Sequence, residues 1–341
     1  MEKQIPLTIV TGFSLKGKNE LLKKVYSNDG NKRLKVLYHD TSFTFIKNEE
    51  EPLPMTSFIG TAVHDAEVTL SNLDTWIEQQ PQCDIDEIVL DIYPFTDVSY
   101  LLDSLVSNTS MYLHSHIHVI GADEFWSAYF SEHEIQFTCS ETKERIIYTL
   151  GETLMSQLEM AQTVVLSNSD SLSFEEQGEL TTFIQTLVPT STIKRIDDFC
   201  WEHEKRETTF ELKGASYLYT QQVDLFESRN DIPIIGHYGI DTYVFKSIYP
   251  VDFPKLEQFF SKLPNEVFRM KGTCYNPSLK ESYIISQVGS SVQVNTYEVD
   301  LLPLDGVLSE FLFIGAELDR VHLKNCLDFC LHIPENTRYL G

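Results

Sequence analysis

The stretch IPLTIVTGFSLKGKNELLKKVY, from Ile5 to Tyr26, decides the fold. It opens with a short apolar and β-branched run, which predicts a buried strand. Gly12 and Gly17 then bracket a turn, and Lys18 precedes apolar residues at helical spacing. In a loop of the pattern G-x-x-x-x-G-K between a strand and a helix, backbone N–H groups point inward and hold phosphate oxygens. The sequence therefore predicts a phosphate-binding loop from Gly12 to Asn19, with Lys18 reaching the terminal phosphates.

The end of this motif departs from the full pattern, which closes with a Ser or Thr whose hydroxyl binds Mg²⁺. Asn19 stands at that position and Glu20 follows it. An amide oxygen also binds cations, and an acid in the first turn suits the helix dipole. Two interpretations are open on the motif alone. One is a nucleotide site, and the other is an ordinary strand–turn–helix that binds no nucleotide.

Composition limits the class of protein. The 341 residues suffice for about two domains, and 42% hydrophobic content provides sizeable cores. A net charge of −25, from 26 basic and 51 acidic residues, argues against a nucleic-acid partner and against an anionic membrane surface.

Targeting signals and paired cysteines are not visible in the sequence. No apolar run has the length of a transmembrane helix, and the N-terminus lacks the apolar core of a signal peptide. The six cysteines are scattered and none forms C-x-x-C. We therefore expect a reduced, cytoplasmic chain.

Alternating patterns organise the first 195 residues or so. Apolar runs with helical segments between them predict an α/β fold, a mostly parallel sheet with helices on both faces. Near the C-terminus a hairpin pattern around Gly289 and a last helix capped by Asp319 predict a smaller α+β domain. We expect a first domain over 1–197, a linker or crossover over 198–233 and a second domain over 234–341. The predicted strands of the first domain are 7–10, 33–38, 87–92, 112–120, 163–166 and 193–196, and its predicted helices lie at 63–79, 98–106, 149–160 and 173–187. Ser173, with Glu176 three residues later, predicts a capping box at the start of the last of these helices.

Several fragments, in this order, resemble the CobW-type P-loop GTPases, a group that includes zinc and cobalt metallochaperones. The N-terminal stretch is similar to that family's I-P-V-T-V-L-T-G-F-L-G-x-G-K-T-T-L-L. Farther along, GHYGI at 236–240, FRMKG at 268–272 and FIG with LD at 313–319 resemble its H-G-I, R-x-K-G and F-I-G-x-x-L-D. The resemblance covers nearly the whole chain. It implies a P-loop GTPase domain joined to a CobW C-terminal domain, with GTP and Mg²⁺ as ligands.

The departures from the family's motifs weaken that implied site. The cysteine metal motif G-C-x-C-C falls on 57–61, SFIGT, which has no thiolate, so tight zinc binding is not expected there. The acid after the second strand falls on Asp40. The catalytic E-x-x-G falls on Asp91 to Pro94, which keeps the acid but replaces the glycine by a residue without an N–H. Of the guanine-reading N-K-x-D only Asp170 remains.

Three other groups of side chains are candidates for metal sites. His114, His116 and His118 alternate along one predicted strand, and His322, Cys326 and Cys330 share a helix face. In both sets we favour packed core residues over ligands, because sheets of this class are covered on both faces and free cysteines are often buried. The remaining pair, Cys200 with His203, is half a site. No metal ligand is assigned.

Two hypotheses of different class follow. In the first, the chain is a metallochaperone-related GTP-binding protein with eroded sites. Lys18 and the loop of Gly12, Gly17 and Asn19 bind phosphates weakly, Asp91 is the catalytic-region acid that remains near Mg²⁺ or the attacking water, and Asp170 reads the base. In the second, it is a pseudo-GTPase that keeps the fold as an interaction module for a client protein. Hydrolysis is expected to be weak or absent in both.

Overall fold

The computed structural model describes residues 4–28, 34–38, 56–58, 66–79, 85–96, 98–106, 108–138, 145–201, 238–276, 278–297 and 306–333. They divide into two compact units, and the division falls after Asn230. That point lies outside the described residues, as does most of the expected linker, so the predicted domain boundaries stay a prediction. Among the described helices, none has the length and apolar character needed to cross a bilayer.

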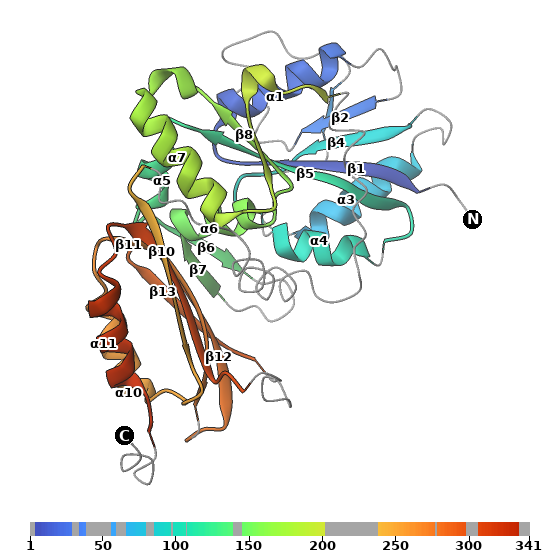
Figure 1. Cartoon of the computed structure of the whole chain (residues 1–341). Helices are drawn as coiled ribbons and strands as arrows, with labels where there is room; N and C mark the ends of the chain where they lie inside the picture. Colours follow the sequence, from blue (N-terminus) through green and yellow to red (C-terminus); the bar gives the residue numbers. More distant parts are fainter. Residues whose placement is uncertain are drawn as a thin grey trace. The chain divides into compact units, whose positions relative to one another are not determined.

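The first unit is built on one seven-stranded sheet in which every neighbouring pair is parallel. The strand order is β3-β2-β4-β1-β5-β8-β9, so the strand before the glycine loop lies in the middle of the sheet (Figure 1). This confirms the predicted fold class. The strands are β1 Ile5–Thr11, β2 Leu34–Tyr38, β3 Thr56–Phe58, β4 Glu87–Asp91, β5 Met111–Gly121, β8 Thr163–Ser167 and β9 Thr192–Arg195.

Helices connect these strands. Ser173 starts α7 with the capping box that the sequence predicts, because its side chain accepts from Glu176 N–H while the Glu176 side chain accepts from Ser173 N–H. Thr149 caps α6 in the same way. The helices are α1 Leu15–Asn28, α3 Ala66–Glu78, α4 Val98–Val106, α5 Phe125–Tyr129, α6 Leu150–Glu159 and α7 Phe174–Leu187, with single 3₁₀ turns η1 Ser169–Ser171 and η2 Ile196–Asp198.

Alternate residues of β1 enter two different cores. Ile9 packs in the cluster that contains Leu73 of α3 and Leu101 of α4. Its neighbour Val10 packs in the cluster that contains Leu21 of α1. Since successive side chains of a strand point to opposite faces, helices cover both faces of the sheet.

Some elements were not expected from the sequence. The strands β6 Glu134–Thr138 and β7 Arg145–Thr149 pair in antiparallel fashion, and α5 is a single short helix after β5. Phe199 and Trp201 are buried in the core beside α1, so the packing of the first unit extends beyond residue 197. These features depend on contacts between distant residues, which local periodicity does not encode.

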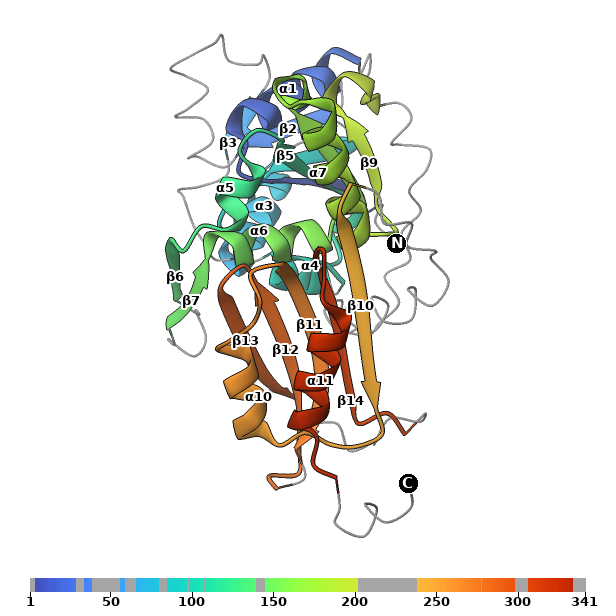
Figure 2. The ribbon, with the colours of Figure 1, turned by 60° about the vertical axis from the view of Figure 1, so that its left-hand side comes forward.

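The second unit is a five-stranded antiparallel sheet in the order β10-β14-β11-β12-β13, with α10 and α11 packed on one face (Figure 2). The predicted hairpin is present, with Val288 paired to Ser291 around Gly289. Asp319 caps α11 by accepting from His322 N–H at 2.9 Å. The elements are β10 Ile240–Ser247, α10 Phe253–Phe260, β11 Val267–Asn276, β12 Glu281–Val288, β13 Ser291–Tyr297, β14 Ser309–Ala316 and α11 Arg320–Cys330.

Asp252 stands at the N-cap position of α10, but its side chain makes no capping hydrogen bond. Its carboxylate lies 3.1 Å from Lys255 Nζ instead. Pro254, in the first turn, has no N–H to be capped, which leaves fewer donors for an N-cap side chain to satisfy.

Candidate functional site

Gly12 is held against the neighbouring strand. Its φ is +117°, and a Cβ there would lie 2.1 Å from the carbonyl oxygen of Val119 in β5. Real Cβ atoms do not approach that closely, and a side chain at this φ is strained as well. The turn after β1 therefore requires glycine, whether or not a ligand binds.

Gly17 is also required by packing. It lies in the first turn of α1, where a Cβ would fall 2.3 Å from Ser167 Oγ at the end of β8. The helix starts early, at Leu15, so Lys18 N–H already donates to the carbonyl of Ser14 at 2.8 Å. The second half of the motif is thus helical, and the open loop is shorter than the motif predicts.

Lys18 and Asp91 form a buried ion pair. Lys18 Nζ lies 2.7 Å from Asp91 Oδ1 and donates to the carbonyl of Ile92 at 3.3 Å. Asp91 ends β4, directly beside Val10 of β1. The structure thus brings together the two predicted charged residues at the carboxyl edge of the sheet, where ligands of open α/β folds bind.

Asn19 has a buried side-chain oxygen, Oδ1, with no hydrogen-bond partner among the described residues. An orphaned oxygen of this kind is costly unless a donor or a cation meets it. Amide and carboxylate oxygens are the ligands that Mg²⁺ prefers. The donor set of Asn19 and Asp91 therefore fits this ion.

Asp170, the residue expected to bind the guanine base, already has an ion-pair partner in this structure. Asp170 lies in η1, just after β8, and its carboxylate pairs with the guanidinium of Arg195 at the end of β9. The structure places Asp170 at the same edge of the sheet as Lys18, because β1, β5 and β8 are successive neighbours. Arg195 was not identified from the sequence, since the contact joins residues 25 positions apart.

Pro94 follows β4 where the family pattern has glycine. Its carbonyl accepts from Gln157 Nε2 of α6 at 2.6 Å. Gln157 Oε1 and Oγ1 of Thr96, two residues after Pro94, are buried oxygens without a hydrogen-bond partner in the described part. The segment is thus tied to α6 and supplies no backbone donor at Pro94.

Thr11 links two buried histidines of β5. Its Oγ1 lies 2.9 Å from His116 Nε2 and 2.8 Å from His118 Nδ1. His116 Nδ1 lies 3.0 Å from the carbonyl of Met160 and must be its donor. The neutral His116 then accepts the Thr11 hydroxyl proton at Nε2, and Thr11 accepts from His118 Nδ1–H.

Burial keeps both imidazoles in the neutral form. It lowers the pKa of His116 to about 4, although the hydrogen bond to the Met160 carbonyl raises this pKa in part. Burial also lowers the pKa of His118 well below 6.5, and the nearby His116 and Lys18 lower it further. His116 is a satisfied core residue, as the structural interpretation expects. His114 occupies a bulge, because Leu7 pairs with Leu113 and Thr8 with Ser115.

Of the three residues expected to pack on one face of α11, Cys330 is buried, whereas Cys326 is half-buried and His322 is exposed, so the expectation is wrong for His322. Cys330 is buried and donates to the carbonyl of Cys326 at 3.1 Å, and burial raises the pKa of its thiol to about 11. His322 Nε2 lies 3.6 Å from Cys326 Sγ. In the described ranges no group of three or more His, Cys, Asp or Glu is placed to hold a metal. Cys200 is half-buried, and His203, Asp40 and residues 59–61 lie outside these ranges.

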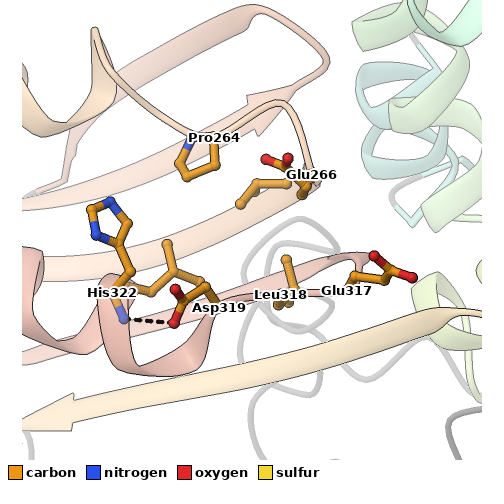
Figure 3. A pocket seen from close by; sticks show the side chains of 8 residues that line it. Pro264, Glu266, Glu317, Leu318, Asp319 and His322 are labelled. Carbon is orange, nitrogen blue, oxygen red and sulfur yellow. Dashed lines mark hydrogen bonds between the residues drawn. The ribbon is translucent and has the colours of Figure 1, made fainter.

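A small pocket of about 270 Å³ belongs to the second unit (Figure 3). Its lining includes Glu266, Glu317, Asp319 and His322. Asp319 points to the first turn of α11, where it serves as the helix cap. All the residues that line this pocket belong to the second unit.

Comparison with known proteins fits this arrangement. Residues 240–331 match the family described as the cobalamin synthesis protein cobW C-terminal domain. The Zn(II)-bound YjiA GTPase from E. coli is 13% identical, over 97% of this chain and all of that one, with a TM-score of 0.38. HypB from Helicobacter pylori in complex with nickel is 11% identical, over 67% and 89%, with a TM-score of 0.33.

The strand order and the glycine loop define a P-loop type of α/β domain followed by an antiparallel α+β domain. Over residues 240–331 the match to the CobW C-terminal domain family confirms the resemblance to CobW-type proteins that the sequence shows there.

Proposed function

We propose that this chain is a CobW-type nucleotide-binding protein with little or no hydrolytic activity. The observation that carries the proposal is the buried pair of Lys18 and Asp91 at the carboxyl edge of β1 and β4. A lysine is almost never buried without a charged partner or a role that needs it. Here the lysine follows a glycine turn and lies in the first turn of α1, at the helix N-terminus, where the helix dipole favours anions.

Phosphate binding would exchange the partners of this pair. Lys18 would turn from Asp91 to the phosphates, and the Asp91 carboxylate would then need a new counter-charge. Asn19 Oδ1 and Asp91 are the groups that would hold Mg²⁺, which would supply positive charge against the phosphates, but without the usual hydroxyl we expect them to hold it weakly. Asp170 would accept hydrogen bonds from a guanine edge once Arg195 moves aside.

Catalysis has less support than binding. The protein mainly positions groups and stabilises charge in phosphoryl transfer. Asn19 replaces the hydroxyl that usually holds the metal, and Pro94 offers no N–H to the γ-phosphate. Asp91 would be the remaining carboxylate near Mg²⁺ or the attacking water. We therefore expect turnover by this chain to be slow.

The direct test is a thermal-shift and calorimetric titration with GTP, GDP and ATP, each with and without Mg²⁺. We expect stabilisation by guanine nucleotides that is weak and depends little on Mg²⁺. The control is the double substitution Lys18→Met with Asp91→Asn, which removes the binding charge without leaving its partner buried and unpaired. Binding that persists in this variant would show that Lys18 does not hold the phosphates.

A second candidate is a pseudo-GTPase that serves as an interaction module. It is favoured by the packing of Gly12 and Gly17, because both are required by contacts with Val119 and Ser167 in the absence of any ligand. In that case millimolar nucleotide would give no thermal shift, and the folded chain would bind its client with Lys18 and Asp91 still paired.

The CobW-type family also includes metallochaperones. We propose that this chain is related to them, but we assign no metal site to it. The family's thiolates have no counterpart in SFIGT at 57–61. Competition for zinc between this chain and a chromophoric chelator would measure whether the chain binds zinc at all.

A further inference from the structure

Ser14 is buried at the N-terminus of α1 and satisfies two of the helix's first N–H groups. Its carbonyl accepts from Lys18 N–H at 2.8 Å, and its hydroxyl oxygen accepts from Gly17 N–H at 3.3 Å. Only 6% of the residue is exposed. Ser14 is therefore the N-cap of the helix that carries Lys18.

The position of its hydroxyl is fixed from the other side by Ser167. Ser167 Oγ donates to the carbonyl of Ile120 at 3.0 Å. Its only proton is used there, so the 3.4 Å contact between the two hydroxyls has Ser14 as donor. The remaining lone pairs of Ser14 Oγ then face Gly17 N–H.

The surroundings leave little freedom for this side chain. A Cβ at Gly17 would lie 3.0 Å from Ser14 Oγ, and a Cβ at Gly121 would lie 3.1 Å from it. The hydroxyl thus fills a narrow space between α1, β5 and β8, which two glycines keep open. Gly17 N–H, a donor of the predicted phosphate-binding loop, is therefore already engaged by an oxygen of the chain itself.

From this geometry we propose that Ser14 sets the nucleotide affinity by acting as an internal substitute for a phosphate oxygen. The inference rests on the proposed function, since it concerns the same loop. Gly17 N–H can serve either Ser14 Oγ or a phosphate, so a nucleotide must displace the hydroxyl before the helix N-terminus receives it. Ser14 is a positioning residue, and the side chain itself leaves when the ligand enters.

Removal of the hydroxyl should therefore favour the bound state. In Ser14→Ala the Gly17 N–H has no acceptor in the free protein, while its bond to a phosphate is unaffected. We expect GDP, and inorganic pyrophosphate as a minimal probe, to bind roughly fivefold more tightly, a gain comparable to one helix-cap hydrogen bond. In Ser167→Ala the Ser14 hydroxyl loses the oxygen to which it donates and is held less firmly. We therefore expect a smaller gain in affinity for the same two ligands.

The matched control is Ser173→Ala. Ser173 is the N-cap of α7, and its hydroxyl accepts from Glu176 N–H at 3.3 Å, as Ser14 does from Gly17. This variant loses a cap of the same kind away from the loop, and its affinity for GDP should equal that of the wild type. Calorimetry supplies the affinities, and the amide resonance of Gly17 in an ¹H–¹⁵N spectrum reports the loss of the cap independently of any ligand.

Wild-type protein that binds GDP, with Ser14→Ala and Ser167→Ala no tighter, would overturn the role of Ser14 and leave the proposed function intact. Failure of the wild type and both variants to bind either probe would overturn both. If Ser14→Ala does not fold by circular dichroism, Ser167→Ala decides the matter by itself.

Discussion

Lys18 Nζ lies 2.7 Å from Asp91 Oδ1, and both side chains are 2% exposed. Loss of one partner leaves the other charge buried, which costs about 3–5 kcal/mol. We therefore expect Lys18→Ala and Asp91→Ala each to lower the free energy of unfolding by about that amount, as measured by urea denaturation. Lys18→Met with Asp91→Leu should recover most of the loss. Single variants as stable as the wild type would mean that the two groups are solvated in solution.

GTP hydrolysis should be far slower than in P-loop GTPases with intact motifs. One missing preorganised donor costs on the order of 3 kcal/mol, or roughly a hundredfold in rate. Here Asn19 and Pro94 each replace such a group, although their effects need not add. Single-turnover assays with radiolabelled GTP measure the rate. Turnover comparable to intact enzymes, lost in Asp91→Asn, would show that other groups compensate.

Stability should fall in mild acid because of His116 and His118. Their pKa values are lowered in the folded protein, to about 4 for His116, so the unfolded chain binds more protons below about pH 6.5. The stability is full above that pH and is lost as the pH falls toward 4. The slope is up to about 1.4 kcal/mol per pH unit for each histidine.

Urea midpoints at pH 7, 6 and 5 test this, since most carboxylates remain ionised there. His116→Gln with His118→Gln should flatten the dependence on pH, whereas His133→Gln, at an exposed position, should not. An unchanged slope in the double variant would place the acid sensitivity elsewhere.

Zinc should not bind tightly at residues 58–61, because thiolates are what make the family's motif a zinc site. Equilibrium dialysis with zinc is the measurement. The informative variant restores the missing cysteines, as Phe58→Cys, Gly60→Cys and Thr61→Cys, and should gain zinc affinity. Nanomolar zinc binding by the wild type, abolished by changes in this segment, would contradict the expectation.

Arg195 should weaken the preference for guanine. It pairs with Asp170, so a nucleotide base must compete for the carboxylate. Arg195→Ala should raise the ratio of GTP to ATP affinity by up to about fivefold, the equivalent of an exposed ion pair worth roughly 1 kcal/mol. Arg320→Ala breaks the similar pair with Asp241 in the second unit and should leave the ratio unchanged. Equal ratios of GTP to ATP affinity in the two variants would show that Asp170 does not recognise the base.

Local signals predicted much of the fold. The capping box at Ser173, the hairpin around Gly289 and the cap at Asp319 each depend on residues within a few positions, so the sequence alone was sufficient. The alternation of apolar strands and helices likewise predicted the parallel sheet.

The candidate site was harder to predict, because its contacts cross the sheet. Thr11 meets His116 over 105 positions, and Ser14 meets Ser167 over 153. A serine just before a helical pattern is a known N-cap signal, so Ser14 could have been noticed. The early start of α1 and the pairing of Asp170 with Arg195 have no comparable local signal.

The two glycines of the loop have a consequence for how such chains change over generations. Val119 O and Ser167 Oγ exclude any larger residue at Gly12 and Gly17, so the fold would retain both even in a descendant that never met a nucleotide. The side chains of Asn19 and Ser14 instead present polar atoms to the loop, since Asn19 Oδ1 has no hydrogen-bond partner in the described part and Ser14 Oγ accepts from Gly17 N–H. Selection for ligand binding would therefore leave its record at these two positions, and a survey of natural variants should show the history of the site there.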